Sequence, residues 1–221
     1  GERMTSGSLS SLWDFYGEAF RIHSHQLLAW AHMDVRSRLH SDLDEPAITG
    51  LIAEAMKFRL DFHTDTPDSY LHYTIGDQEP HSPDEELGIE RLRLDITVIR
   101  SGIRPRLSFV FEAKRLRTGG FPISKYVGAG GMDDFISTRY AANCPEAAMV
   151  ALYQNKDVSY WHGELNRAFN HDSRSLFPTL KTIGDLTNVT IHEELTDELQ
   201  SNHQRSNGTM LLLFHIFLDC R

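Results

Sequence analysis

Asp95, Glu112 and Lys114 are the residues of this chain whose types and spacing best fit a chemical reaction, the hydrolysis of a phosphodiester bond. That reaction needs a divalent cation to polarise the phosphate, an activated water, and positive charge to balance the negative charge that develops. Two carboxylates can hold the cation, and a lysine can orient the water and offset charge. The three residues are therefore a candidate catalytic set.

The segments around this set alternate between apolar and polar residues with the period of two that is typical of β-strands. Segment 92–98 carries Asp95 and Thr97 on its polar face, and segment 107–114 carries the other acid and the lysine on its own polar face. The link at 101–105 contains Ser, Gly and Pro, which favour turns. The two segments are predicted to form a hairpin that brings the three side chains to one patch.

The remaining elements are predicted from apolar periodicity and from helix-start and turn residues. Before the hairpin we expect one long broken helix or two short ones over 8–40, a helix over 42–60, a strand at 70–75 and a loop at 77–88. After the hairpin we expect a helix at 125–142, despite its glycines, and a buried strand at 147–153. In the tail we expect a helix at 161–169 and a short strand at 189–191, while 210–218 fits either a strand or a buried helix.

The hairpin resembles the metal-binding motif of PD-(D/E)xK nucleases, a superfamily in which an aspartate is followed, across a hairpin, by an apolar strand ending in Glu-x-Lys. Here the pattern reads Leu94-Asp95, then Phe109-Val110-Phe111-Glu112-Ala113-Lys114, with leucine in place of the family's proline. The resemblance implies an α/β fold with a restriction-endonuclease-like core, in which elements in the order αβββαβ form a central mixed sheet flanked by helices. That core covers 42–155 of a single domain 1–221, between an N-terminal helical extension at 1–41 and a C-terminal α+β extension at 156–221.

The same resemblance implies a role for each residue of the motif. Asp95, Glu112 and the carbonyl of Ala113 would hold Mg²⁺, for which Mn²⁺ is a substitute. Lys114 would orient or deprotonate the attacking water.

A further acid usually comes from the first core helix of this superfamily, and Glu45 and Glu54 are the two candidates. At a helical step of about 100° per residue, Glu45 falls near the margin of the apolar face, whereas Glu54 lies further round toward solvent. We therefore prefer Glu45 as a catalytic residue that binds a second cation or its water. The alternative is an ordinary acid in a first helical turn, where the helix dipole favours negative charge.

Several other polar residues lie where they can contact a nucleic-acid substrate, by their position after the motif or after the last core strand. These candidates are Arg115, Arg117, Lys125, Arg139, Tyr140 and Gln154. Cations in such places meet backbone phosphates. Each has an alternative as a surface charge, a half-buried aromatic or a structural polar group.

Histidines gather in two parts of the chain. His23, His25 and His32 lie in the first predicted helix, where we interpret them as solvated side chains because no acid or cysteine shares their spacing. In the tail, Ser201, His203, Arg205 and His215 form a polar cluster that we interpret as core histidines or a loop, in preference to metal ligands.

Composition bounds the environment of the protein. The net charge of −9 argues against a surface that binds nucleic acid over its whole extent. Seventeen of the basic residues are arginine and five are lysine, and arginine is the better bidentate partner for phosphate. The two cysteines lack a CxxC spacing, which favours a reducing, cytoplasmic setting. The apolar run 210–218 is too short to span a membrane.

The resemblance to PD-(D/E)xK nucleases implies a Mg²⁺-dependent nuclease that cuts DNA, with prokaryotic restriction or anti-phage defence as its setting. One alternative is a partner-dependent nucleic-acid-binding subunit of a defence complex, which the acidic composition favours. Another is an effector that cleaves RNA. The expected partner is DNA more than RNA, with no membrane involved, and the chain is compatible with a protein partner or a homodimer.

Overall fold

The computed structural model describes residues 6–81, 92–170 and 185–221. In chain order its helices are α1 (Ser6–Val35), α2 (Glu45–Phe62), α3 (Ile123–Val127), α4 (Met132–Ile136) and α5 (Val158–Phe169), with 3₁₀ turns η1 (Arg36–Arg38) and η2 (Asp68–His72). Its strands are β1 (Tyr73–His81), β2 (Leu92–Arg100), β3 (Leu107–Leu116), β4 (Glu146–Tyr153), β5 (Thr187–Val189), β6 (Glu198–Gln204) and β7 (Met210–Asp219). None of the helices in these ranges is at once long and apolar enough to cross a membrane.

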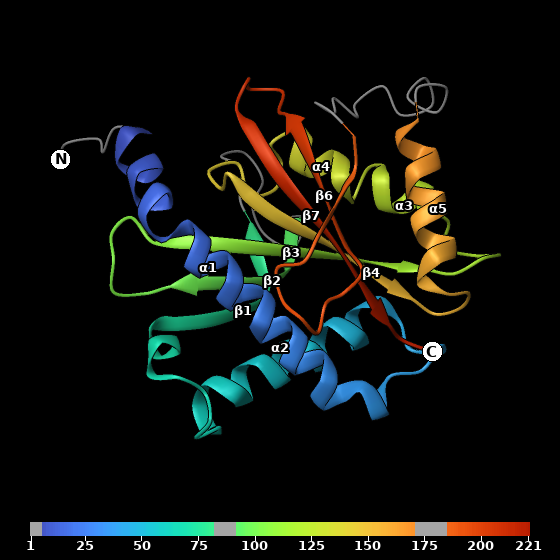
Figure 1. The fold of residues 1–221 in the computed structure, drawn as a ribbon, viewed down its shortest axis with the longest axis horizontal. Coiled ribbons are helices and arrows are strands. Elements are labelled where there is room, and N and C mark those ends of the chain that lie inside the picture. Colours follow the sequence, from blue (N-terminus) through green and yellow to red (C-terminus); the bar gives the residue numbers. More distant parts are fainter. Residues whose placement is uncertain (1–5, 82–91, 171–184) are drawn as a thin grey trace.

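The seven strands form one mixed sheet in the order β1-β2-β3-β4-β7-β6-β5 (Figure 1). The predicted hairpin is present as the antiparallel pair β2 and β3, and β4 runs parallel to both β3 and β7. The predicted α/β class is therefore confirmed, and α2, β1, β2, β3, α3 with α4, and β4 follow one another in the expected order. The tail adds three strands to this same sheet, because β7 pairs with β4 along its length.

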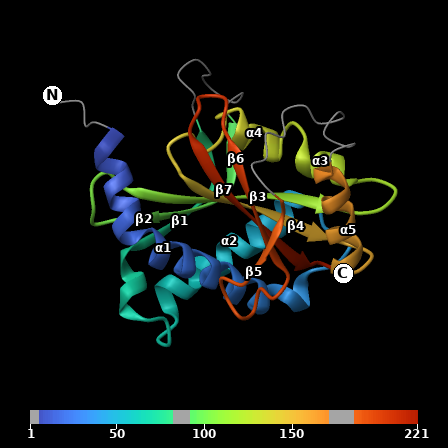
Figure 2. The same cartoon turned by 45° about the horizontal axis from the view of Figure 1, so that its top comes forward.

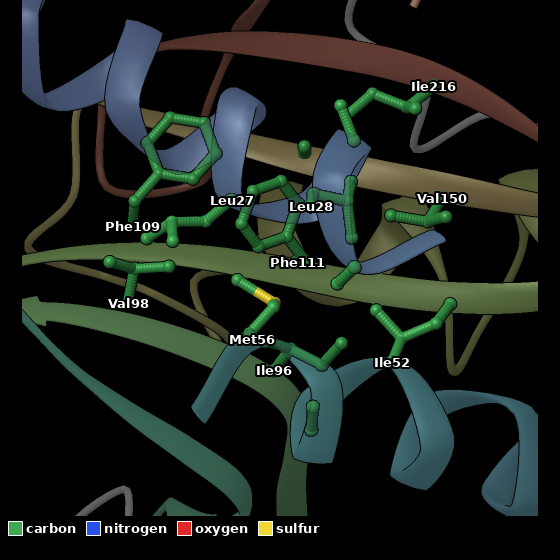
Figure 3. Packing of buried hydrophobic residues seen from close by; sticks show 14 of the residues in the cluster. Leu27, Leu28, Ile52, Met56, Ile96, Val98, Phe109, Phe111, Val150 and Ile216 are labelled. Atoms are coloured by element: carbon green, nitrogen blue, oxygen red, sulfur yellow. The ribbon is translucent and has the colours of Figure 1, made fainter. Parts of the chain in front are cut away.

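Side-chain alternation in the strands divides the core into two layers. One face of the sheet, with Phe109 and Phe111 at its centre, packs against α1 and α2, as Figure 3 shows. The other face packs against α3, α4 and α5. Figures 1 and 2 show the two groups of helices on opposite sides of the sheet. Both phenylalanines are fully buried, and burial of each such ring stabilises the fold by about 1.5–3 kcal/mol.

The start of α2 is fixed by its own sequence. Asp44 is the N-cap, and its side chain accepts a hydrogen bond from the backbone N–H of Ala47 at 2.9 Å. Pro46 lies in the first turn, where its missing N–H costs nothing. This cap decides where Glu45, the first residue of the helix, projects.

Two predicted elements were clearly wrong in extent. The helix expected over 125–142 is two short helices, because the glycines between them allow the chain to turn: a Cβ at Gly131 would lie 2.3 Å from the carbonyl oxygen of Tyr126. The strand expected at 70–75 begins at Tyr73 and continues to His81, through part of the expected loop, and 82–88 lies outside the described residues. Segment 210–218 is a strand, one of the two alternatives predicted for it, and β6 was not predicted.

The interpretation of the helical histidines as solvated was also wrong. His25 is fully buried, where its Nδ1 bonds to the carbonyl of Arg21 at 2.8 Å and its Nε2 lies 3.2 Å from Glu198. His32 bonds to the Asp219 carbonyl, and His23 bonds to a tyrosine hydroxyl. These contacts arise because α1 packs lengthwise on the sheet, so strands that are distant in sequence supply partners that helical spacing does not reveal.

Candidate active site

The hairpin that carries the catalytic set opens at one end. In the described parts of both strands, β2 pairs with β3 only from Ile96 to Arg100, while β2 continues to pair with β1 as far as Leu92. At the opening, Oδ2 of Asp95 accepts a hydrogen bond from the backbone N–H of Ala113 at 2.8 Å. A carboxylate thus takes the place of a strand partner. Because the N–H and C=O of one strand residue point to the same side, the carbonyl of Ala113 faces the opening as well.

Glu45 satisfies the next amide along this edge of β3. Its Oε2 accepts a hydrogen bond from the backbone N–H of Arg115 at 2.8 Å, and its Oε1 accepts one from Nζ of Lys114 at 3.0 Å. The first residue of α2 is thereby joined to the end of β3. Glu54, the other candidate acid, is exposed on the same helix.

Lys114 is held between two carboxylates. Besides Glu45, its ammonium donates to Oε1 of Glu112 at 2.9 Å. Burial lowers the pKa of Lys114, but the carboxylates of Glu112, Glu45 and Asp95 together outweigh burial and raise that pKa above its ordinary value. The side chain is therefore a cation at neutral pH, suited to balance charge and to hold a water by donation, and not to take up a proton.

Glu112 is the most constrained acid of the site. It is 2% exposed, and burial, reinforced by the negative charge of Asp95, raises its pKa to about 8 although Lys114 acts in the opposite direction. Its Oε2 is buried and has no hydrogen-bond partner among the described residues. Among the four side chains gathered here, Asp95, Glu112 and Glu45 are acids and Lys114 alone is basic, so the group is short of positive charge. We call these four residues the charged cluster.

The donor atoms of the charged cluster can be tested for their fit to a metal. In the described ranges, no group of three or more His, Cys, Asp or Glu side chains is arranged to hold one. Glu45 already accepts from a lysine and from a backbone amide. The oxygens of Asp95, Glu112 and the Ala113 carbonyl are of the kind that Mg²⁺ takes, together with several waters that it keeps. The unpartnered Oε2 of Glu112 is what such a cation would satisfy.

Thr97 also belongs to this face of the hairpin. It lies opposite Val110 in the register, two residues from Asp95, and is 5% exposed. Its hydroxyl has no hydrogen-bond partner in the described part of the chain. Alternation in the sequence places it on the polar face, but nothing in the motif gives it a role.

Two of the expected substrate contacts are occupied within the protein. Arg115 donates to the carbonyl of Leu43 at 3.2 Å, and its guanidinium stacks 3.9 Å from the centre of the Phe121 ring. Gln154 is buried and donates to the same Leu43 carbonyl at 2.7 Å. Both side chains therefore hold the segment before α2 in place by hydrogen bonds. That segment in turn sets the position of Glu45.

The other expected contacts lie nearer to solvent or line the site. Arg117 and Lys125 are exposed, and Arg139 is half exposed beside Asp134, 3.4 Å away. Tyr140 is buried, and the pKa of its phenol is raised by burial first and then by the negative charge of Glu112. The structure thus gathers the motif and Tyr140 in one electrostatic environment. Among the three cations, Arg117 donates to the carbonyl of Ser41 at 3.3 Å and Arg139 pairs with Asp134, and all three have exposed surface that can meet a ligand.

A second polar group lies on the same face of the sheet, further along it. Oγ of Ser201 lies 2.6 Å from Nε2 of His203 and 2.8 Å from Nε2 of His215, whose Nδ1 lies 3.0 Å from the hydroxyl of Tyr126. The prediction that these histidines belong to the core is confirmed, since both are fully buried. Burial lowers the pKa of His203 to about 4, so its ring is neutral. We call these four residues the histidine chain.

No protein-family model, no curated protein and no solved structure matches this chain. Function therefore has to be inferred from the arrangement of its own side chains.

Proposed function

We propose that this protein is a metal-dependent nuclease that hydrolyses phosphodiester bonds of DNA, built on a restriction-endonuclease-like core. The observation that carries the proposal is the opening between β2 and β3, where Asp95, Glu112 and Lys114 converge and Glu112 keeps a buried oxygen without a hydrogen-bond partner. A buried, unpaired carboxylate oxygen is costly unless it serves a ligand. The resemblance of the motif to PD-(D/E)xK nucleases points to the same chemistry.

Asp95, Glu112 and the carbonyl of Ala113 would hold Mg²⁺, or Mn²⁺ in its place. When bound there, such a cation polarises a phosphate oxygen and lowers the pKa of a water. A cation also supplies the positive charge that the four side chains lack, which explains why three acids are gathered around one lysine.

The chain's own residues supply the remaining parts of the reaction. Lys114, kept as an ammonium by its neighbouring acids, would orient the attacking water and offset the charge that develops on the phosphate. Glu45 would position Lys114, because one of its oxygens accepts from the ammonium while the other is fixed by the Arg115 amide. This assignment replaces the expected metal-binding role of Glu45 with a positioning role.

Exposed cations beside the site support a nucleic-acid substrate. Arg117, Lys125 and Arg139 can contact backbone phosphates, which orient a nucleic acid without reading its sequence. The choice of DNA over RNA, a cytoplasmic setting and a role in prokaryotic defence rest on fold-level analogy.

The test is a cleavage assay with plasmid DNA, single-stranded DNA and RNA in Mg²⁺ or Mn²⁺. We expect the wild type to cut DNA, and Lys114→Ala and Asp95→Asn to lose that activity. Lys57→Ala, which removes a lysine on α2 outside the site, is the matched control and keeps it. Cleavage that persists in both site variants would overturn the assignment, and cleavage of RNA alone would change the substrate.

A second candidate is a subunit that binds nucleic acid only with a partner, and the net charge of −9 favours it. For that function the same assay gives no cleavage with either metal. The site variants would then form the complex as well as the wild type does.

A further inference from the structure

Within the residues that the structure describes, two buried oxygen atoms in the charged face of the hairpin lack a hydrogen-bond partner. They are Oγ1 of Thr97 and Oε2 of Glu112, on residues that are 5% and 2% exposed. One is a hydroxyl, which can donate and accept, and the other is a carboxyl oxygen, which accepts while Glu112 is ionised and can donate while it is protonated. The two atoms are complementary, although no direct bond joins them.

The strand register places both side chains on the same face and close together. Thr97 lies opposite Val110, and Glu112 follows Val110 by two residues, so the two are diagonal neighbours across the hairpin. Diagonal residues are about 7–8 Å apart between their Cα atoms, within reach of a long side chain. A threonine is short, and the separation that remains suits one bridging water.

Burial makes a shared water the natural partner for both atoms. Enclosed waters in proteins serve polar groups that would otherwise be unsatisfied, and they need two or more such partners. The face around Thr97 and Glu112 is polar, because Asp95 and Lys114 also lie on it. A dry void at this point would leave a hydroxyl and a carboxylate oxygen unpaired, which folded proteins avoid.

We infer that Thr97 is a positioning residue of the site, whose hydroxyl donates to a water enclosed between it and Oε2 of Glu112. The water fixes the orientation of the carboxylate while Lys114 holds its other oxygen. For a cation bound at Glu112, a step that rests on the proposed function, the same hydroxyl is placed to hold one of the cation's waters. Groups that orient a metal's ligands in this way affect affinity and activity by about 10–100-fold.

The experiment compares Thr97→Val, which keeps the shape but removes the hydroxyl, with Thr97→Ser, which restores it. In a high-resolution crystal structure of the metal-free wild type we expect a water that joins Oγ1 to Oε2, and we expect this water to lose its bond to residue 97 in the valine variant. Cleavage should fall about 10-fold in Thr97→Val and recover in Thr97→Ser. Thr74→Val, at an exposed position of β1, is the matched control.

Two results would overturn the inference. One is a wild-type structure in which no water links the two oxygens. The other is a Thr97→Val variant that melts at a higher temperature with cleavage unchanged, because removal of a truly unpaired hydroxyl is stabilising. If the wild type cuts no nucleic acid, the proposed function fails, but the crystal structure and the melting temperatures still decide the role of Thr97.

Discussion

The charged cluster and the histidine chain lie on the same face of one sheet. They differ in how many of their buried polar atoms have hydrogen-bond partners. Glu112 pairs in register with Met149 and Met149 with His215, so the two groups lie two strands apart with a methionine between them. The charged cluster has an excess of acids and an unpaired carboxylate oxygen. The histidine chain is neutral and nearly complete. Under the proposed function, the unsatisfied group serves reactivity, whereas the nearly complete group serves stability.

One arrangement of protons satisfies the histidine chain. If the hydroxyl of Tyr126 donates to the carbonyl of Met149, then Nδ1–H of His215 donates to Tyr126, the hydroxyl of Ser201 donates to Nε2 of His215, and Nε2–H of His203 donates to Ser201. Only a lone pair on Nδ1 of His203 then stays unpaired. A buried nitrogen lone pair without a donor costs less free energy than a buried N–H without an acceptor. In this arrangement both imidazole rings are uncharged.

The largest expected effect is on cleavage, and it distinguishes the charged cluster from the histidine chain. Glu112→Gln removes a carboxylate that would hold the metal, and we expect cleavage to fall by about 100- to 10,000-fold. Ser201→Ala, in the histidine chain, should change cleavage by less than about twofold once the fraction of folded protein is accounted for. Glu54→Gln on the exposed side of α2 is the control for loss of an acid. Equal losses in the Glu112 and Ser201 variants would remove the distinction between the groups.

Acid should weaken the histidine chain next. The pKa of His203 is lowered to about 4 by burial, so below pH 6.5 the unfolded chain binds a proton that the folded one does not. The free energy of unfolding that this difference contributes above pH 6.5 is therefore lost as pH falls toward 4. The loss is about 1.4 kcal/mol for each pH unit, or about 3 kcal/mol in total. Urea unfolding at pH 7 and pH 4.5 measures the loss. His203→Gln should lose less stability over that range, and identical losses in both proteins would refute the effect.

Removal of one hydrogen-bonding side chain from the histidine chain should destabilise the protein without changing its cleavage activity. Ser201→Ala leaves Nε2 of both histidines without their partner, and we expect the free energy of unfolding to fall by about 1–3 kcal/mol. Ser206→Ala, at an exposed position just after β6, should leave it within about 0.5 kcal/mol. Chemical denaturation at pH 7 measures both. An unchanged free energy of unfolding for Ser201→Ala would mean that the histidine chain contributes nothing to stability.

The smallest effect concerns the turn that presents Tyr140 to the charged cluster. Thr138 has a φ of 67°, a left-handed conformation that a β-branched residue adopts only under strain. Thr138→Gly should raise the free energy of unfolding by about 1 kcal/mol, whereas Ser137→Gly, at a right-handed position, should lower it by about 0.5–1 kcal/mol. If the strain serves the site, Thr138→Gly gains stability and loses cleavage rate. A loss of stability would show that the threonine makes contacts that outweigh the strain.

Local patterns predict much of the fold, because several elements carry strong signals of their own. The alternation in β2 and β3 and the Asp44-Glu45-Pro46 start of α2 are of this kind. The strand β6 has no such signal, since Ser201 and His203 point into the core as polar residues and their partners come from other strands. The break between α3 and α4 depends on close approach of Gly131 to the backbone of Tyr126, which periodicity does not express.

The candidate site likewise has a part that the sequence predicts and a part that depends on the assembled fold. The grouping of Glu112 and Lys114 follows from their spacing on one strand, and that of Asp95 follows from the hairpin. The hydrogen bonds of Asp95 and Glu45 to the backbone of β3 depend on where β2 separates from it, which no residue type signals. The joining of Arg115 and Gln154 at the Leu43 carbonyl is equally a property of the assembled fold.

The most direct test of a metal-dependent site is anomalous scattering from crystals soaked in Mn²⁺. We predict a manganese peak at the opening between β2 and β3, ligated by Asp95 and Glu112, and no peak within the histidine chain. A peak that disappears in Glu112→Gln would tie the metal to that carboxylate. Crystals with no manganese at the opening, in which the two carboxylates point apart, would contradict the account.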